Sequence, residues 1–409
     1  DLKRRPRFSN RKVAFKKVET RKYPLLKKAF NNYEAKKPEK FENDYRQFLE
    51  EHNWWLHDYA LFMAIKSASN NIPWYQWKNE FKFRKKSAIN KAETDYAREI
   101  EFQKFVQFIF FRQWFQLKKY AHSKGVSIIG DMPLYVSGDS VDVWSNTDIF
   151  QLDKELNPVR VGGVPPDYFS ASGQLWGNPV FDWDRIEKRD FDWWLARLHF
   201  KLHFFDEVRI DHFRGLESYW SVPAGDKTAR NGEWVPAKGY QLLRKFREQV
   251  GSMALIAEDL GVITPAVEKL RKAFNLPGMK VLQFAFSTDA KNEYLPHNYT
   301  PNFVAYTGTH DNNTTLGWLQ NLDKKDRSLV KKYLGKPGKK ALRNGIELIW
   351  SSCAKTAILP MQDLLGLNSG ARFNTPGTPN GNWTWRYRGK QLKARHELYL
   401  KEITAKYNR

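Results

Sequence analysis

The feature that most constrains the fold is a series of six short apolar runs between residues 126 and 361, each ending in a polar cluster and followed by a longer segment. The runs are Val126–Asp131, Glu207–Asp211, Ala254–Glu258, Lys280–Phe286, Phe303–Tyr306 and Ala357–Met361. Short strands that alternate with longer segments are typical of α/β folds with parallel sheets. We therefore expect an α/β fold, and specifically a (β/α)8 TIM-type barrel with helical insertion subdomains.

The first 125 residues have a different pattern. In residues 43–66 and 88–124, apolar side chains recur at three- and four-residue spacing, and Gly125 supplies a stop. This pattern predicts a mainly helical insertion subdomain over residues 1–125 and a barrel portion over residues 126–409. A segment at about 132–200 is rich in Gly, Pro, Asp and Trp, which indicates a long loop or subdomain insertion within the barrel.

An eight-stranded barrel needs two strands beyond these six runs, and the helical first 125 residues offer no convincing place for them. A barrel without two of its strands would leave unpaired edges, which are costly and prone to aggregation. The sequence also begins with Asp1 rather than Met. We therefore expect that the chain lacks the N-terminal strands of the barrel and that the printed sequence omits part of the native protein.

Composition narrows the class of protein. The chain has 409 residues, of which 41% are hydrophobic, and no apolar run of 18 residues that would cross a bilayer. Cys353 is the single cysteine, so neither an intramolecular disulfide nor a thiolate metal cluster can form. These features favour a cytoplasmic protein with no membrane partner.

The chain is strongly basic, with 68 Lys and Arg against 45 Asp and Glu and a net charge of +23. This charge makes nucleic-acid binding the first alternative to test. However, the Lys pairs fall in several helical stretches, which favours a dispersed, solvated basic surface and no nucleic-acid partner. The 16 Trp and 28 Phe residues do not decide the matter, because aromatic faces stack on bases and on sugar rings alike.

Three carboxylates follow strand-like runs: Asp211, Glu258 and, just beyond Phe303–Tyr306, Asp311. In a barrel, the active site is built at the carboxyl ends of the strands, so all three are candidates for one pocket. Side chains alternate along a strand, so Arg209 points the same way as Asp211 and would keep that carboxylate ionised. Glu258 follows an apolar run that would raise its pKa. One nucleophile and one acid would result.

A simpler interpretation exists for each of these residues. A carboxylate after a strand is often a helix N-cap or a surface ion-pair partner. The adjacent His212 and His310 can equally be interpreted as polar residues at strand ends whose hydrogen bonds are satisfied by neighbours. No His-x-x-x-His pattern accompanies them, so we expect no catalytic metal and no cofactor. Trp176 sits in a polar, glycine-rich loop, which favours a stacking platform over a core position.

The chain resembles the amylomaltases, the glucanotransferase branch of the α-amylase clan. The segments that carry this resemblance are Arg209-Ile-Asp-His-Phe-Arg-Gly215, Ala257-Glu-Asp-Leu-Gly261 and Tyr306-Thr-Gly-Thr-His-Asp-Asn-Asn313. It extends over residues 130–136, 165–179, 277–286 and 381–386. Members of the family usually begin with two further strands and a Tyr-bearing, glycine-rich loop near the donor sugars, and neither segment is recognisable in this sequence.

The resemblance implies a 4-alpha-glucanotransferase that acts on α-1,4-glucans and maltooligosaccharides by a retaining double displacement. It implies that Asp211 is the nucleophile, Glu258 the general acid/base and Asp311 the stabiliser of the distorted transition state. Arg209 and His310 would line the sugar subsite at the cleaved bond, and Trp176, Asp131 and Asn374 would contact donor or acceptor sugars. Two alternatives stay open: an α-amylase-like glucan hydrolase, and a non-catalytic or nucleic-acid-binding protein. No sequence feature indicates the oligomeric state.

Overall fold

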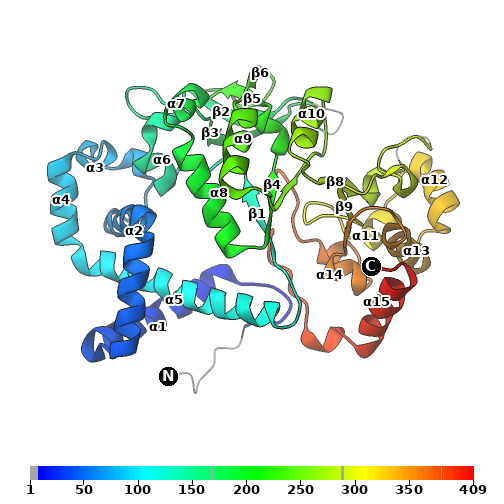
Figure 1. Ribbon diagram of the computed structural model, residues 1–409, viewed down its shortest axis with the longest axis horizontal. Coiled ribbons are helices and arrows are strands. Elements are labelled where there is room, and N and C mark those ends of the chain that lie inside the picture. The colour runs from blue at the N-terminus through cyan, green and yellow to red at the C-terminus, as the bar shows by residue number, and fades with distance from the viewer. Residues whose placement is uncertain (1–7, 167–169, 287–289, 379) are drawn as a thin grey trace. The chain divides into compact units, whose positions relative to one another are not determined.

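The computed structural model describes residues 8–166, 170–286, 290–378 and 380–409 of an α/β protein (Figure 1). The chain divides into two compact units. The N-terminal unit is Glu19–Leu255, and the C-terminal unit is Ile256–Arg409 together with Asp1–Val18. The expected boundary after residue 125 lies within the N-terminal unit, and the predicted division into a helical subdomain and a barrel portion stays a prediction.

Helices make up the first part of the chain, as the apolar spacing predicts. They are α1 (Phe15–Lys36), α2 (Glu39–Ala68), α3 (Asn79–Lys82), α4 (Lys86–Asp95) and α5 (Ala97–His122). The stretch 88–124 is two helices rather than one, because Tyr96, with φ of −111°, separates α4 from α5. Figure 1 shows α2 crossing α5, and aromatic side chains fill the contact between them: Tyr45, Phe48, Phe108 and Phe111.

A parallel strand pair positions the candidate site residues of the N-terminal unit. Strand β1 (Ile129–Pro133) pairs in parallel with β4 (Glu207–Asp211), and helix α8 (Asp192–Phe204) packs against both strands. A Cβ on Gly130 would lie 2.1 Å from the ring of Phe205, so only glycine leaves room for that ring. The parallel pairing is the arrangement that the alternating runs predict.

The long segment after β1 and the stretch after β4 together form a second sheet that the sequence did not predict. Its order is β3-β2-β5-β6, with antiparallel neighbours. The strands are β2 (Arg160–Val164), β3 (Gln174–Pro179), β5 (Ser218–Pro223) and β6 (Glu233–Pro236). The short helix α6 (Val141–Ser145) precedes β2, and the short helix α7 (Trp183–Lys188) follows β3. Residues 167–169 of the motif at 165–179 lie outside the described residues. Helix α9 (Gly239–Val250) then leads to β7 (Leu255–Ala257).

The C-terminal unit contains a parallel sheet of order β10-β9-β8, formed by β8 (Gly278–Val281), β9 (Phe303–Tyr306) and β10 (Thr356–Ile358). Its helices are α10 (Pro265–Ala273), α11 (Thr315–Gln320), α12 (Lys324–Leu334), α13 (Lys339–Trp350), α14 (Met361–Leu364) and α15 (Ala394–Lys406). The run at 280–286 differs from the prediction: the strand ends at Val281, and residues 282–284 form a 3-10 turn.

Strands therefore occur at all six apolar runs. In the part of the chain that the structure describes, no helix combines the length and apolar character needed to cross a bilayer.

A buried ion pair joins the segment after β7 to its neighbours. The carboxylate of Asp259 lies 3.0 Å from Nε of Arg271 on α10, and both side chains are less than a tenth exposed. The backbone N–H of Met279 on β8 donates to Asp259 Oδ1 at 2.7 Å. Burial raises the pKa of Asp259 to about 6, against the lowering effects of the Met279 N–H and the Arg271 charge.

This raised pKa predicts a pH-dependent contribution to stability. Folded Asp259 binds its proton more tightly than the unfolded chain, so its contribution is greatest below about pH 4 and is lost as pH rises through about 6. The free energy of unfolding of the parent protein, minus that of Asp259→Asn, should fall by about 2 kcal/mol from pH 4 to pH 7. Urea unfolding of both proteins at several pH values measures this difference.

Glu268 on the same helix provides the control. The hydrogen bond from Lys272 lowers the pKa of Glu268, so the difference between the parent and Glu268→Gln should instead rise with pH. A difference for Asp259→Asn that is flat or rises with pH would contradict the assignment.

Candidate functional site

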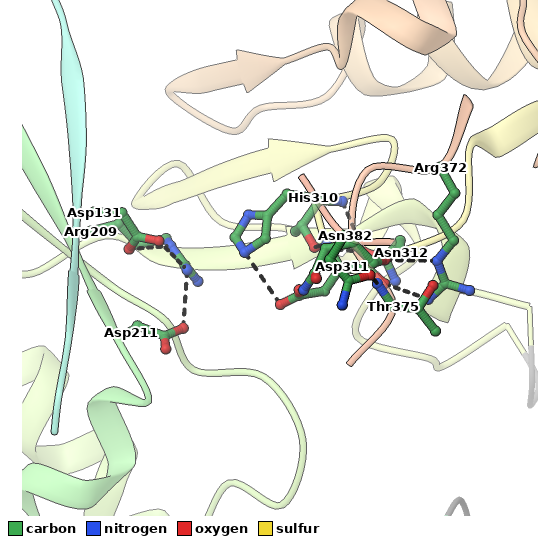
Figure 2. A network of polar contacts seen from close by, with 11 residues as sticks. Asp131, Arg209, Asp211, His310, Asp311, Asn312, Arg372, Thr375 and Asn382 are labelled. Atoms are coloured by element: carbon green, nitrogen blue, oxygen red, sulfur yellow. Dashed lines mark hydrogen bonds and ion pairs between the residues drawn. The ribbon is translucent and has the colours of Figure 1, made fainter. Parts of the chain in front are cut away.

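One buried guanidinium links two of the predicted site carboxylates in the N-terminal unit (Figure 2). Arg209 donates from Nε to Asp131 Oδ1 at 3.0 Å and from Nη2 to Asp131 Oδ2 at 2.8 Å, which is a bidentate pair. The same Nη2 donates to Asp211 Oδ1 at 3.0 Å. The Arg209 side chain is 10% exposed, whereas Asp131 and Asp211 are 50% and 43% exposed. The cation is therefore buried beneath two carboxylates that solvent reaches.

The strand register explains this arrangement. Asp131 is the partner of Arg209 across the β1–β4 pair, and Asp211 is two residues further along the same strand. Because side chains alternate along a strand, all three lie on one face of the pair, opposite Val208 and Ile210. Two carbonyl groups just after Asp131, those of Pro133 and Leu134, accept hydrogen bonds from the guanidinium of Arg197 on α8.

His212 and Trp176 pack against each other beside this strand end. Their rings are 4.8 Å apart and perpendicular. His212 has φ of +54°, in the left-handed region, where the chain turns directly after β4. Burial, and then the charge of Arg214, lower the pKa of His212 to about 4, so its imidazole is neutral near pH 7. Trp176 is 37% exposed and lies on β3 rather than in a loop, and its role as a stacking platform stays a prediction.

Glu258 lies between two anchored residues in the C-terminal unit. The N–H of Ala257 donates to the carbonyl of Pro277 at 2.8 Å, and Asp259 forms the buried ion pair described above. The Glu258 side chain is partly buried, and its Oε1 accepts from the N–H of Leu260 at 3.0 Å. The backbone that carries Glu258 is thus fixed on both sides.

A second polar cluster follows β9 in the C-terminal unit (Figure 2). His310 Nε2 lies 3.3 Å from Asp311 Oδ2. Asn374 donates from Nδ2 to Asp311 Oδ1 at 2.5 Å, and its N–H donates to the His310 carbonyl. Arg372 joins the two segments by donating to the carbonyls of Asp311 and Asn374. Asn374 therefore orients the carboxylate of Asp311, and its expected contact with a sugar stays a prediction.

Two residues of this cluster were missed in the sequence. Arg372 lies two positions before Asn374, and only the fold brings it to Asp311. Trp383 lies within the motif at 381–386, is 45% exposed and packs its ring 5.2 Å from that of His310. It has φ of +59°, which is unusual for an aromatic residue. An exposed aromatic side chain in a motif already quoted was the available signal.

The structure thus places the eight predicted residues in separate groups, some in the N-terminal unit and some in the C-terminal unit. Asp131, Arg209 and Asp211 form one bonded group, with Trp176 against the adjacent His212. The second unit holds Glu258 and the bonded group of His310, Asp311 and Asn374. Their convergence on one pocket stays a prediction. Among the described residues, no group of three or more His, Cys, Asp or Glu side chains is placed to hold a metal ion.

Comparison with known proteins identifies the family. The family model for 4-alpha-glucanotransferase, glycoside hydrolase family 77, matches residues 2–393. The 4-alpha-glucanotransferase of Synechocystis sp. is 46% identical, over 100% of this chain and 82% of the relative. The 4-alpha-glucanotransferase of Thermus thermophilus is 44% identical, over 97% of this chain and 81% of the relative.

Solved structures agree with this result. An amylomaltase from Streptococcus agalactiae, determined in complex with acarbose, superposes with a TM-score of 0.94 at 38% identity, over 98% of this chain and 81% of that one. An amylomaltase from Corynebacterium glutamicum shares the fold, with a TM-score of 0.76 at 17% identity, over 98% and 60% of the two chains. The chain belongs to the 4-alpha-glucanotransferase family and is an enzyme that transfers glucan segments.

Proposed function

We propose that this enzyme transfers α-1,4-glucan segments by a retaining double displacement in which Asp211 is the nucleophile. The observation that carries the proposal is the contact of Asp211 with the buried Arg209. A neighbouring cation favours the ionised carboxylate, and the exposed part of Asp211 leaves room for a sugar. The acarbose complex of the related amylomaltase supports a maltooligosaccharide as the substrate class.

In the proposed first step, an oxygen of Asp211 attacks the anomeric carbon of the donor sugar, and the glycosidic bond breaks. Glu258 gives its proton to the departing glycosidic oxygen. In the second step, the 4-hydroxyl of the acceptor glucan loses its proton to Glu258, and its oxygen displaces Asp211 from the anomeric carbon. Two inversions at this carbon leave the α-configuration unchanged.

The second cluster serves the transition state in this scheme. Asp311, oriented by Asn374 and paired with His310, would hold hydroxyl groups of the distorted donor sugar. Arg209 and His310 would line the subsite at the cleaved bond, while Trp176 and Asp131 would contact neighbouring sugars. A neutral His212 supports Trp176 without adding charge. No step of this scheme requires a metal ion or a cofactor.

We further propose that the two parallel sheets are portions of one (β/α)8 barrel. The parallel β1–β4 pair and the parallel order β10-β9-β8 support it, as does the position of each candidate carboxylate at or just after the carboxyl end of a strand. The single Cys353 supports a reducing, cytoplasmic location. An α-amylase-like hydrolase, which the sequence left open, is not favoured by the family match.

Replacing the nucleophile should abolish transfer without unfolding the protein. Asp211→Asn keeps the shape of the side chain but removes its charge, so maltotriose disproportionation should fall by at least about ten-thousandfold. Glu207→Gln, at the exposed start of the same strand, is the matched control and should retain activity. Retained turnover by Asp211→Asn, in a protein with an unchanged circular dichroism spectrum, would refute the role of Asp211.

Glu258→Gln should behave differently, because an activated donor needs no protonation of its leaving group. With maltosyl fluoride, the variant should form the glycosyl-enzyme and then stall, since no base activates the acceptor. Mass spectrometry should detect an added maltosyl mass on the peptide that contains Asp211. Sugar attached to another residue would show that the two carboxylates are assigned wrongly.

The retaining mechanism also sets a distance. In a crystal structure of the enzyme, the carboxyl groups of Asp211 and Glu258 should be about 5 to 5.5 Å apart, so that direct attack needs no intervening water. A separation of about 6.5 to 9.5 Å would instead indicate an inverting reaction.

A further inference from the structure

A buried carboxylate in the C-terminal unit holds both ends of the segment that carries His310 and Asp311. Asp363, on the short helix α14, is 2% exposed. Its Oδ2 accepts from the hydroxyl of Thr307 at 2.7 Å and from the hydroxyl of Thr315 at 2.6 Å. Its Oδ1 accepts from the backbone N–H of Thr315 at 2.8 Å. One side chain therefore makes three hydrogen bonds to two residues that are eight positions apart in sequence.

These two threonines mark the limits of the segment. Thr307 is the first residue after β9, and Thr315 is the first residue of α11. Both are fully buried. Between them run Gly308 to Thr314, which include the proposed catalytic residue Asp311. Since Thr307 and Thr315 bond to the same carboxylate, Asp363 links the two ends of the segment.

Other contacts complete the support. The side chain of Gln283 donates to the carbonyl of Asn313 at 2.9 Å and to the hydroxyl of Thr315 at 3.3 Å. A Cβ on Gly308 would lie 2.5 Å from Gln283 Nε2, so a larger residue at this position would displace the Gln283 amide. On the Asp311 side, Arg372 and Asn374 hold the carbonyl and the carboxylate. The segment is thus fixed at its base by Asp363 and at its tip by residues 372–374.

The cost of this arrangement argues for a role beyond packing. Burial disfavours the ionised form of a carboxyl group unless a nearby cation or several hydrogen-bond donors offset the loss of hydration. Burial raises the pKa of Asp363, whereas the three hydrogen bonds lower it. Within the described part of the chain, no Lys, Arg or His side chain forms an ion pair with Asp363. An apolar residue would fill the space without this desolvation but could not accept these three hydrogen bonds.

We propose that Asp363 is a positioning residue for glucan transfer, which ties Thr307 to Thr315 and thereby sets the place of the His310–Asp311 pair. The proposal rests on the proposed role of Asp311 in stabilising the transition state. Rate enhancement by a preorganised carboxylate is sensitive to small displacements, so loosening the base of the segment should slow the chemical step.

The test uses near-isosteric variants of the two threonines, because Asp363→Asn keeps one acceptor oxygen and so does not release all of the bonds. Thr307→Val removes one hydroxyl bond at the β9 end, and Thr315→Val removes the other while it keeps the backbone N–H. Each should lower kcat for maltotriose disproportionation by about tenfold with a smaller change in KM. Thr404→Val, which removes a hydroxyl bonded to Trp350 in the same unit, is the matched control. It should lower the melting temperature but leave kcat unchanged.

A double-mutant cycle with Asp311→Asn separates positioning from a purely structural role. With maltosyl fluoride as donor, Thr307→Val should change the residual rate of the Asp311→Asn enzyme by less than about twofold. An equal loss in both backgrounds, or a lower melting temperature with an unchanged kcat, would overturn the proposal. Full activity of Asp311→Asn alone would overturn the role of Asp311 on which the proposal rests, and is distinguishable from both of those outcomes.

Discussion

Pairing of the buried Arg209 guanidinium is the interaction on which the candidate nucleophile depends. A guanidinium that is 10% exposed has lost most of its contact with water and must be compensated by anions. The β1–β4 register supplies them by placing Asp131 directly across from Arg209 and Asp211 two residues beyond it. Once the strands are paired in this register, Arg209 holds both carboxylates without any further loop.

The second cluster is held by a different means. Asp311 lies in an irregular segment, where no strand neighbour fixes its side chain. Arg372 and Asn374 donate hydrogen bonds to it at the tip. At the base of the segment, Asp363 accepts hydrogen bonds from Thr307 and Thr315. A side chain at a strand end is thus positioned by backbone pairing, whereas a side chain in a loop is positioned by separate side-chain hydrogen bonds.

This difference explains how much the sequence could predict. The bounds of β4 and β9 coincide with their apolar runs, because the central residues of each run are buried and polar residues end or follow the run. Asp211, Glu258 and Asp311 stand out for the same reason. The antiparallel sheet was missed in part because β3 alternates weakly and half of its residues are exposed. Arg372 was missed because its partner Asp311 is 61 residues away in sequence, a pairing that no local pattern encodes.

Because one nitrogen of Arg209 is shared by two carboxylates, amino-acid substitutions around it are coupled. Nη2 donates to Asp131 and Asp211 at the same time, so the two carboxylates compete for it. A substitution at position 131 therefore changes how firmly Arg209 holds the oxygen of Asp211, even though residue 131 never touches the bond being made. Positions 131, 209 and 211 are expected to show epistasis, and a change tolerated at one of them in a relative depends on what occupies the other two.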